Sequence, residues 1–338
     1  MKTVAELETC LARPSEKLVR DMAHIEGDIL ILGAGGKMGP SLAKLAKNAR
    51  EQAGSKHRVI AVSRFSSDPI RQDLEQHRVD TIAADLLDEE QLNALPEAPY
   101  VIYLAGRKFG TQGAESLTWA MNTYLPGRVA EKFRKSRIVA FSTGNVYPLR
   151  PVVRGGASEE EPARPVGEYA QSCLGRERIF HYFSEKYGTP MVFFRLNYAI
   201  DLRYGVLLEI AQAIQQRRPI DLSMGTVNVI WQGDANATAL RALNICSSPP
   251  KILNVTGPEN VSVRWLAERF GERLGVEPIL QGEECESALL SNASASHQLF
   301  GYPQVSLRQM IAWTADWVKA GGPSLAKPTH FQEREGVF

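Results

Sequence analysis

The stretch Asp28-Ile29-Leu30-Ile31-Leu32-Gly33-Ala34-Gly35-Gly36-Lys37-Met38-Gly39-Pro40 decides the fold that the sequence predicts. Its apolar run, dominated by Ile and Leu, is typical of a parallel strand that is covered on both faces. The glycines let the backbone turn sharply and approach a ligand, and the free N–H groups at the start of the next helix can hold a pyrophosphate. We therefore expect a strand, a glycine turn and a helix of a dinucleotide-binding fold. A glycine turn that only caps a helix is the alternative.

The spacing of these glycines separates two kinds of dinucleotide fold. The dehydrogenase pattern G-x-G-x-x-G requires glycine at position 38, where the sequence has Met38. The observed pattern, Gly33-x-x-Gly36-x-x-Gly39, instead resembles that of the short-chain dehydrogenase/reductase superfamily. The resemblance implies that the turn binds the cofactor through Gly33, Gly36, Lys37, Met38 and Gly39.

Composition excludes several classes of protein. The 338 residues are 44% hydrophobic, enough for one large core or two unequal ones. A net charge of +1 without a basic run argues against nucleic acid as a partner. The absence of a long apolar stretch or a signal-peptide core argues against a membrane partner and predicts a cytoplasmic protein. The four cysteines form no C-x-x-C pair, and the histidines no cluster, so neither a disulfide framework nor a metal site is predicted.

Apolar segments and helical patterns alternate along the chain in a βαβ rhythm. Helical patterns such as Leu117–Lys135 and Glu168–Tyr187 separate most of the predicted strands, and this alternation predicts a doubly wound parallel sheet, an α/β fold of the Rossmann type. The predicted strands after the first are Arg58–Ser63, Asp80–Ala84, Tyr100–Leu104, Arg137–Ser142, Pro190–Leu196 and Lys251–Val255.

Four parts are expected around this sheet. Residues 28–198 and 227–257 form the Rossmann domain, and residues 199–226 and 258–320 form a smaller α+β substrate-binding cap over the strand ends. Residues 1–27 form a helical extension with Ser15 as an N-cap, and residues 321–338 a tail. We also expect Asp234 to be the N-cap of a helix over Ala235–Ile245.

Further segments, in the right order, resemble the extended branch of the superfamily, the NAD-dependent epimerase/dehydratase family, from about Asp28 to about Trp317. The resemblance implies that Thr143, in Ser142-Thr143-Gly144-Asn145-Val146-Tyr147, and Tyr169, in Glu168-Tyr169-Ala170, are catalytic. Asn122 lies where the family has its helix asparagine, which we expect to tie helix to strand. The remaining residues that the resemblance assigns to the cofactor site are Asp85 and Leu86 near the adenine and Leu104, Ala105 and Gly106 along the fourth strand.

The end of the second strand indicates which dinucleotide is preferred. An arginine at that point suits the 2′-phosphate of NADP, whereas a carboxylate suits NAD. The strand ends at Ser63-Arg64, and Lys37 offers a second cation, so we expect NADP, with NAD possible. A merely solvated Arg64 is the alternative.

A cysteine replaces the lysine of the family motif Tyr-x-x-x-Lys. The sequence has Tyr169-Ala170-Gln171-Ser172-Cys173, and a phenol with a pKa of about 10 needs a nearby cation to act as a base at neutral pH. A protonated phenol can still donate its proton during carbonyl reduction. Three explanations stay open: a substitute cation (Arg176, Arg107 or Lys108), participation of Cys173 as a thiolate, or loss of redox chemistry.

These observations predict an NAD(P)-dependent enzyme that acts on a sugar, sugar acid or nucleotide sugar by hydride transfer, with reduction favoured. Arg203, Asn197 and Lys108 follow predicted strands where such a substrate would lie. The alternative is a catalytically inactive NAD(P)-binding module with a sensing or structural role. By analogy with the family, we expect a homodimer formed through the helices Leu117–Lys135 and Glu168–Tyr187.

Overall fold

The centre of the protein is a seven-stranded parallel sheet with the order β12-β7-β5-β4-β1-β2-β3. The computed structural model describes residues 1–66, 68–108 and 110–337, so Phe338 of the predicted tail lies outside the described residues. The strand order reverses between β1 and β4, which is the arrangement of a doubly wound sheet, and the predicted α/β fold is confirmed. The strands are β1 (Ile29–Leu32), β2 (Val59–Ser63), β3 (Asp80–Ala83), β4 (Tyr100–Tyr103), β5 (Arg137–Thr143), β7 (Met191–Leu196) and β12 (Lys251–Val255).

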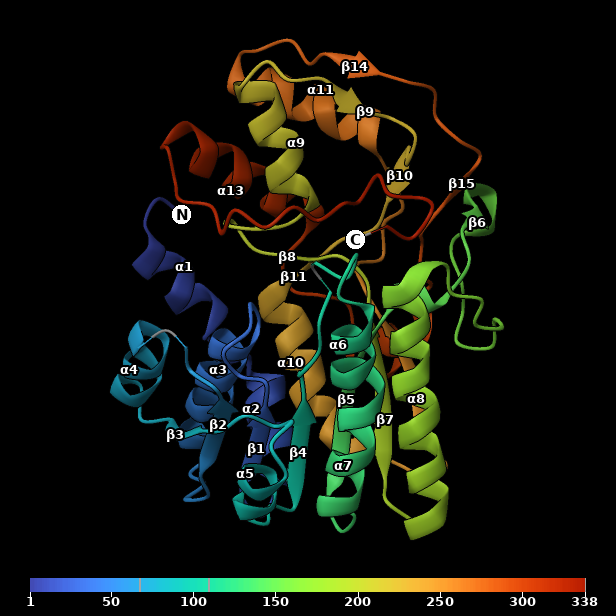
Figure 1. The fold of residues 1–338 in the computed structure, drawn as a ribbon. Helices are drawn as coiled ribbons and strands as arrows, with labels where there is room; N and C mark the ends of the chain where they lie inside the picture. Colours follow the sequence, from blue (N-terminus) through green and yellow to red (C-terminus); the bar gives the residue numbers. More distant parts are fainter. Residues whose placement is uncertain (67, 109, 338) are drawn as a thin grey trace.

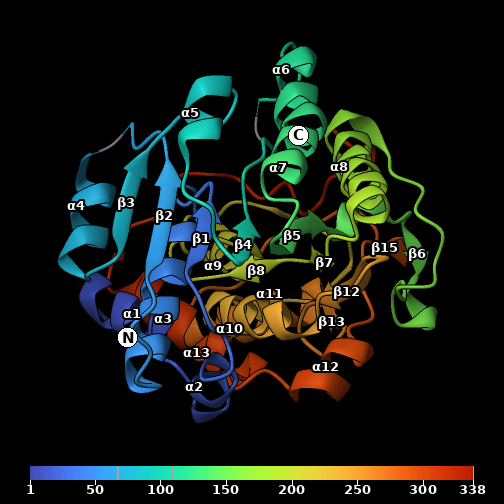
Figure 2. The same cartoon turned by 90° about the horizontal axis from the view of Figure 1, so that it is seen from below.

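Helices cover both faces of the sheet (Figure 2). Alternate residues of β1 enter opposite cores: Ile29 and Ile31 pack with apolar residues of α2, α3 and α10, and Leu30 and Leu32 pack with those of α5, α7 and α8. Each fully buried side chain of this kind contributes about 1.5–3 kcal/mol, which explains the unbroken apolar run. The helices around the sheet are α2 (Glu16–Met22), α3 (Gly39–Gln52), α4 (Asp68–Gln76), α5 (Glu89–Ala94), α6 (Glu115–Trp119), α7 (Leu125–Lys132), α8 (Gly167–Tyr187) and α10 (Gln232–Ala242).

A smaller body with its own core lies over the carboxyl ends of the strands (Figure 1). Its helices are α9 (Val206–Gln215), α11 (Val263–Leu274) and α13 (Leu307–Lys319), whereas α12 (Ser294–Phe300) packs against β12. Short two-residue strands complete it and join it to the sheet: β6 (Arg150–Pro151), β8 (Ala199–Ile200), β9 (Ile220–Asp221), β10 (Thr226–Val227), β11 (Ile230–Trp231), β13 (Val261–Ser262), β14 (Leu280–Gln281) and β15 (Ser287–Ala288). We refer to this body as the cap.

The N-terminal helices connect the two bodies. Leu7 and Leu11 of α1 (Val4–Leu11) belong to the core of the cap, whereas Leu18 of α2 belongs to a core of the sheet. Ser15 caps α2 as predicted, because its Oγ accepts a hydrogen bond from the amide of Leu18 at 3.2 Å. The first 27 residues therefore bind the cap to the sheet.

Two local predictions differ from the structure. The single helix expected over Leu117–Lys135 is divided into α6, a π-helical turn (Ala120–Tyr124) and α7, which ends at Lys132. The prediction that Asp234 is an N-cap is wrong, because α10 already begins at Gln232. The Asp234 carboxylate instead accepts a hydrogen bond from the amide of Val305 at 3.0 Å, a tertiary contact that local sequence does not reveal.

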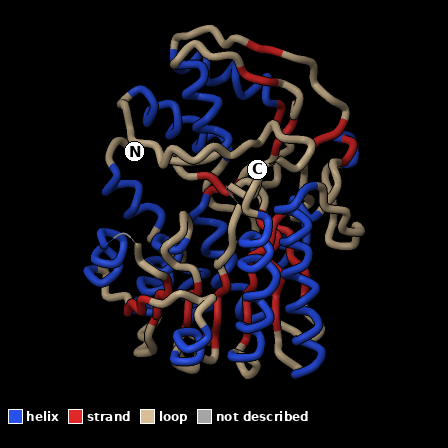
Figure 3. The backbone as a smooth tube through the Cα atoms, viewed as in Figure 1, coloured by secondary structure: helices blue, strands red, loops and turns tan. Residues whose placement is uncertain are grey.

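The described residues after α13, up to Val337, contain no helix or strand, and they run as an irregular chain across the molecule between the cap and the sheet (Figure 3). Among the described residues, no helix combines the length and the apolar character that a membrane span requires.

Candidate active site

The glycine turn between β1 and α3 has a backbone that other residues would disturb. Gly33 has a φ of +88°, and a Cβ added to it would lie 2.6 Å from the amide nitrogen of Ala105, at the end of the neighbouring β4. A Cβ on Gly39 would lie 2.2 Å from the carbonyl oxygen of Ala34. Both glycines are therefore required for the turn to pass this close to its neighbours.

The outer side of the same turn fits a dinucleotide. Gly36 is exposed, and a Cβ there would meet only one carbonyl oxygen at 3.5 Å. No side chain caps the first turn of α3, and the amides of Lys37 and Met38 have no acceptor within the part of the chain that the structure describes. Unpaired amides at a helix N-terminus attract an anion, so these groups would hold the pyrophosphate of a dinucleotide.

The other residues predicted for the cofactor surround this turn. Arg64 follows β2 and is exposed, and Asp85 follows β3, where its carboxylate accepts a hydrogen bond from the amide of Leu87 at 3.0 Å. Leu86 is buried in the core of the sheet. On the other side of β1, the segment Leu104–Gly106 follows β4 and ends at the exposed Gly106. Parallel strands bring all of these positions to one edge of the sheet.

Thr143 and Tyr169 lie together in a cavity of about 180 Å³ at the same edge. Thr143 is the last residue of β5, and Tyr169 is in the first turn of α8. The Tyr169 hydroxyl lies close enough to the side chains of Thr143 and Cys173 for both to influence its pKa. The Thr143 hydroxyl also donates to Asn145 Oδ1 at 3.0 Å and accepts from the amide of Asn145 at 3.1 Å. The structure thus brings the two predicted catalytic hydroxyl residues together in one cavity.

Tyr169 is protonated at neutral pH in this environment. Burial, reinforced by Cys173, raises the pKa of Tyr169 well above its ordinary value, although Arg176 acts in the opposite direction. Burial likewise raises the pKa of the Cys173 thiol, which is completely buried. The thiolate explanation for Cys173 is therefore disfavoured, and the raised pKa of Tyr169 suits a proton donor better than a base.

Arg176 brings a positive charge close to Tyr169 and Cys173, and Cys173 stands at the lysine position of the family motif. Its guanidinium is buried and donates to the carbonyl oxygen of Phe141 and to Asn122 Oδ1, each at 2.7 Å. A Cβ on Gly106 would lie 2.4 Å from Arg176 Nη2, so the guanidinium reaches the end of β4. Asn122 lies in the π-helical turn and also bonds the amide and carbonyl of Arg107, so it ties helix to strand as predicted. Such π-turns are frequent at functional sites.

Two lysines reach the same cavity from the ends of different strands. Lys37 Nζ lies 3.4 Å from the carbonyl oxygen of Ala199 and 3.4 Å from the centre of the Tyr204 ring. Burial lowers the pKa of Lys37 to about 7, although Asp201 acts in the opposite direction. Burial lowers the pKa of Lys108 to about 8, and its ammonium donates to the carbonyl oxygen of Thr329 at 3.3 Å.

The two remaining predicted substrate residues lie in different environments. Asn197 lines the cavity, and its amide donates to Asn228 Oδ1 at 2.8 Å. Arg203 does not reach the cavity around Thr143: it forms ion pairs with Asp201 at 2.9 Å and with Glu8 of α1 at 2.6 Å. Its charge is already compensated, so the structure gives Arg203 a structural position between the N-terminal helix and the cap.

A buried ion pair supports the catalytic strand from behind. Arg195 of β7 bonds both carboxylate oxygens of Glu177 of α8, at 2.9 and 2.6 Å, and Ser142 donates to the same carboxylate. Arg195 also donates to the Tyr147 hydroxyl at 2.7 Å. Sequence reasoning did not identify Glu177, although its position one helical turn after Cys173 was a signal.

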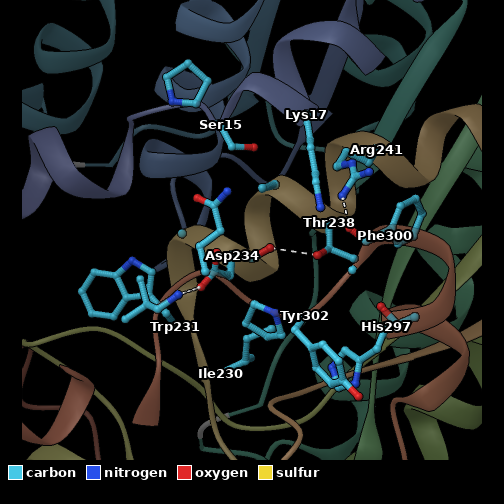
Figure 4. Close-up of a pocket in the computed structure, with 18 of the residues that line it drawn as sticks. Ser15, Lys17, Ile230, Trp231, Asp234, Thr238, Arg241, His297, Phe300 and Tyr302 are labelled. Atoms are coloured by element: carbon cyan, nitrogen blue, oxygen red, sulfur yellow. Dashed lines mark hydrogen bonds between the residues drawn. The ribbon is translucent and has the colours of Figure 1, made fainter. Parts of the chain in front are cut away.

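Sequence reasoning also missed Thr329, which lines the cavity from the C-terminal segment. No local pattern announces it. A second cavity, of about 190 Å³, lies between the N-terminal helices, α10 and α12, with Lys17, Asp234 and His297 on its walls (Figure 4). None of the site residues predicted from sequence lines this second cavity.

The sheet and its glycine turn are those of the extended short-chain dehydrogenase/reductase class. A family model described as "NAD dependent epimerase/dehydratase family" matches residues 29–200, just over half of the chain, and the protein belongs to this family. A comparison with curated proteins found no match.

Solved structures of similar fold include UDP-glucuronic acid 4-epimerase from Bacillus cereus in complex with UDP-glucuronic acid and NAD, with 18% identity and a TM-score of 0.70. UDP-glucose 4-epimerase from Thermus thermophilus in complex with NAD has 19% identity and a TM-score of 0.71. In both comparisons the match covers 86% of this chain and 99% of the other chain. About one residue in seven of this protein therefore lies outside the part that matches these two structures.

Proposed function

We propose that the protein is an NAD(P)-dependent enzyme that transfers hydride to or from a carbinol or carbonyl carbon of a sugar-type substrate, with reduction favoured. The family membership supports a nicotinamide cofactor, and the open amides of the glycine turn fit its pyrophosphate. The observation that carries the proposal is that Thr143 and Tyr169 line one cavity at the edge of the sheet where this turn lies.

The side chains in the cavity define the proton-transfer half of the reaction. The bound dinucleotide supplies or accepts the hydride. In the direction of reduction, the Thr143 hydroxyl turns from Asn145 Oδ1 and donates its hydrogen bond to the carbonyl oxygen, and Tyr169 donates its proton to that oxygen as the C=O electron pair moves onto it. This transfer forms the alcohol and converts Tyr169 into a phenolate, which then takes a proton from water. Because burial raises the pKa of Tyr169, it holds this proton at neutral pH, which favours reduction over oxidation.

Arg176 takes over the electrostatic part of the lysine's role in this proposal. Its charge lowers the pKa of Tyr169 against the larger effect of burial, so it stabilises the phenolate that reduction produces. The buried hydrogen bonds to Phe141 and Asn122 fix the guanidinium, and Lys108 lies 5.8 Å from the centre of the Tyr169 ring as a second cation.

Among the residues that suggested NADP rather than NAD, only Arg64 still supports that preference. We expected Lys37 to assist it, but Lys37 Nζ lies at Ala199 and Tyr204 inside the cavity. The exposed Arg64 at the end of β2 supports NADP, whereas the similar folds named above were solved with NAD. We keep the preference for NADP as a proposal that a direct binding comparison decides.

Tyr169→Phe tests the catalytic assignment. The variant removes only the hydroxyl, so cofactor binding should persist while turnover of a confirmed substrate falls by about 10²–10⁴-fold, the usual contribution of a general acid. Tyr182→Phe is the matched control, because Tyr182 is exposed on the same helix. Unchanged turnover by Tyr169→Phe would refute the assignment.

A binding module without turnover is the second candidate, and Cys173 at the lysine position favours it. Both candidates predict dinucleotide binding, so binding cannot separate them. Stopped-flow absorbance of the nicotinamide with a panel of sugars and sugar acids does separate them. Hydride transfer to or from any of these compounds excludes the binding module.

A further inference from the structure

The C-terminal segment 323–337, which we call the strap, is bound across the space between the cap and the sheet (Figure 1). At its start, the amide of Leu325 donates to the carbonyl oxygen of Arg203 at 2.9 Å. In its middle, the amide and hydroxyl of Thr329 both donate to the carboxylate of Glu209 on α9. Phe331 is buried in the core of the cap. The strap is therefore part of the folded structure.

The far end of the strap is held on both bodies. Arg334 donates to the carbonyl oxygen of Ser223 at 3.0 Å and to both oxygens of Ser287, each at 2.8 Å. Gly336 packs directly on Gly167, the first residue of α8: a Cβ on Gly167 would lie 2.1 Å from the carbonyl oxygen of Gly336. Both glycines have a φ of +80°, so neither position accepts a side chain without strain. This contact lies two residues before Tyr169.

The strap divides the space beside the catalytic residues. On its inner side Thr329 lines the 180 Å³ cavity that contains Thr143 and Tyr169. On its outer side lies another cavity, of about 340 Å³, lined by strap residues 324, 326–328, 331 and 332. Tyr204 and Gly205 line both cavities, so the two are neighbours that the strap separates.

The inner cavity is smaller than the pockets that usually hold ligands as large as a nucleotide-linked sugar. Pockets for drug-sized ligands usually enclose about 300–1,000 Å³, and the inner cavity has about 180 Å³ before the cofactor takes its share. Thr329 lies on the wall of the inner cavity that the strap forms, and the neighbouring strap residues line the outer cavity.

The polar groups of the inner cavity suit a small anion with several hydroxyl groups. Lys37 and Lys108 supply two ammonium groups, and within the described chain no carboxylate lies at ion-pair distance from Lys37. The nearby carboxylates are engaged, since Asp201 bonds Arg203 and Glu209 bonds Thr329. The amides and hydroxyl groups that also line the cavity can both donate and accept hydrogen bonds with a polyol. They belong to Thr143, Asn145, Asn197 and Tyr198.

We infer that the strap is a specificity-determining wall that restricts the substrate to a small polyhydroxy acid, such as a free sugar acid, and excludes its nucleotide-linked form. The inference deepens the proposed function and rests on it. In this arrangement Lys37 and Lys108 bind the carboxylate, and Thr329 closes the side on which a nucleotide would extend.

Isothermal titration calorimetry of the whole protein tests the inference with three pairs of probes: D-glucuronate, D-galacturonate and D-glucose, each free and UDP-linked, with and without saturating NADP. At least one free acid should bind about tenfold more tightly than its UDP-linked form and about tenfold more tightly than glucose, a difference of about 1.4 kcal/mol in each case. Equal or tighter binding of the UDP-linked forms, or no binding of either free acid, would overturn it.

Strap variants give an independent measurement. Arg334→Ala combined with Gly336→Val removes the anchors at the far end, and affinity for the UDP-linked acid should rise about tenfold. Glu335→Gln is the control, because Glu335 is exposed and its side chain contacts none of these anchors. An unchanged preference in a folded double variant, checked by its thermal unfolding, would also overturn the inference. Loss of NADP binding alone would count against the proposed function only. The inference about the strap would still be tested, because the ligand comparison is repeated without cofactor.

Discussion

Glu177→Gln should be strongly destabilising, although residue 177 is not in the active-site cavity. The Glu177 and Arg195 side chains are only 5% and 4% exposed, and two hydrogen bonds of 2.6 and 2.9 Å join them. Removing the negative charge leaves the guanidinium buried without compensation, because its remaining partner, the Tyr147 hydroxyl, is neutral. Losing one member of a buried ion pair costs about 3–5 kcal/mol of the free energy of unfolding.

Urea denaturation followed by tryptophan fluorescence measures this cost. Glu284→Gln is the matched control: Glu284 pairs with Arg264 at 2.8 Å, but the two side chains are 41% and 46% exposed, so the loss should stay below about 1 kcal/mol. Replacing Glu177 and Arg195 together by Met should recover much of the stability, because no buried charge is then left unpaired. Equal losses in Glu177→Gln and Glu284→Gln would refute the argument from burial.

Three further predictions concern catalysis, cofactor and assembly. Because the pKa of Tyr169 lies well above its ordinary value, its phenolate fraction grows about tenfold per pH unit below that pKa, so alcohol oxidation should accelerate about tenfold for each pH unit between about pH 7 and 9 while reduction stays level; a plateau of the oxidation rate near neutrality, in steady-state absorbance, would contradict this. Arg64→Ala should weaken NADP binding about tenfold in a fluorescence titration and leave NAD binding unchanged, because only NADP carries the 2′-phosphate; equal losses for both would show that Arg64 does not select the cofactor. Leu117, Tyr124 and Tyr182 are exposed on α6, the π-turn and α8, so Tyr124→Glu with Tyr182→Glu should convert the expected homodimer into a monomer in light scattering, and a monomeric parent protein would contradict the expectation.

The parts of the site that sequence predicts are those that strand direction fixes. In a parallel sheet every strand ends at the same edge, so motifs that follow strands must meet there. This holds for Gly33 after β1, Gly106 after β4 and Thr143 at the end of β5. Tyr169 joins them because α8 starts at the same edge. The order of these segments along the chain was therefore sufficient to predict the fold.

Long side chains and the strap escaped prediction for a different reason. Lys37 belongs to the glycine turn, but its ammonium contacts Ala199, which is 162 residues away in the sequence. Arg203 looked available for a substrate, yet Glu8 of the N-terminal helix neutralises it. Thr329 lies in a segment rich in Gly, Pro and charge, which resembles a loose tail. In each case the deciding partner is distant in sequence and has no local signature.

The replacement of lysine by Cys173 becomes intelligible from the position of Arg176. A lysine at 173 would place its ammonium in a region where the Arg176 guanidinium already bonds Phe141 and Asn122, and two buried cations would repel each other. Cysteine is small and apolar enough to be buried there, beside the Tyr169 hydroxyl. The charge is thus moved about one helical turn along α8 and held by fixed hydrogen bonds. It lowers the pKa of Tyr169, but burial outweighs it, so Tyr169 keeps its proton, as the proposed reduction requires.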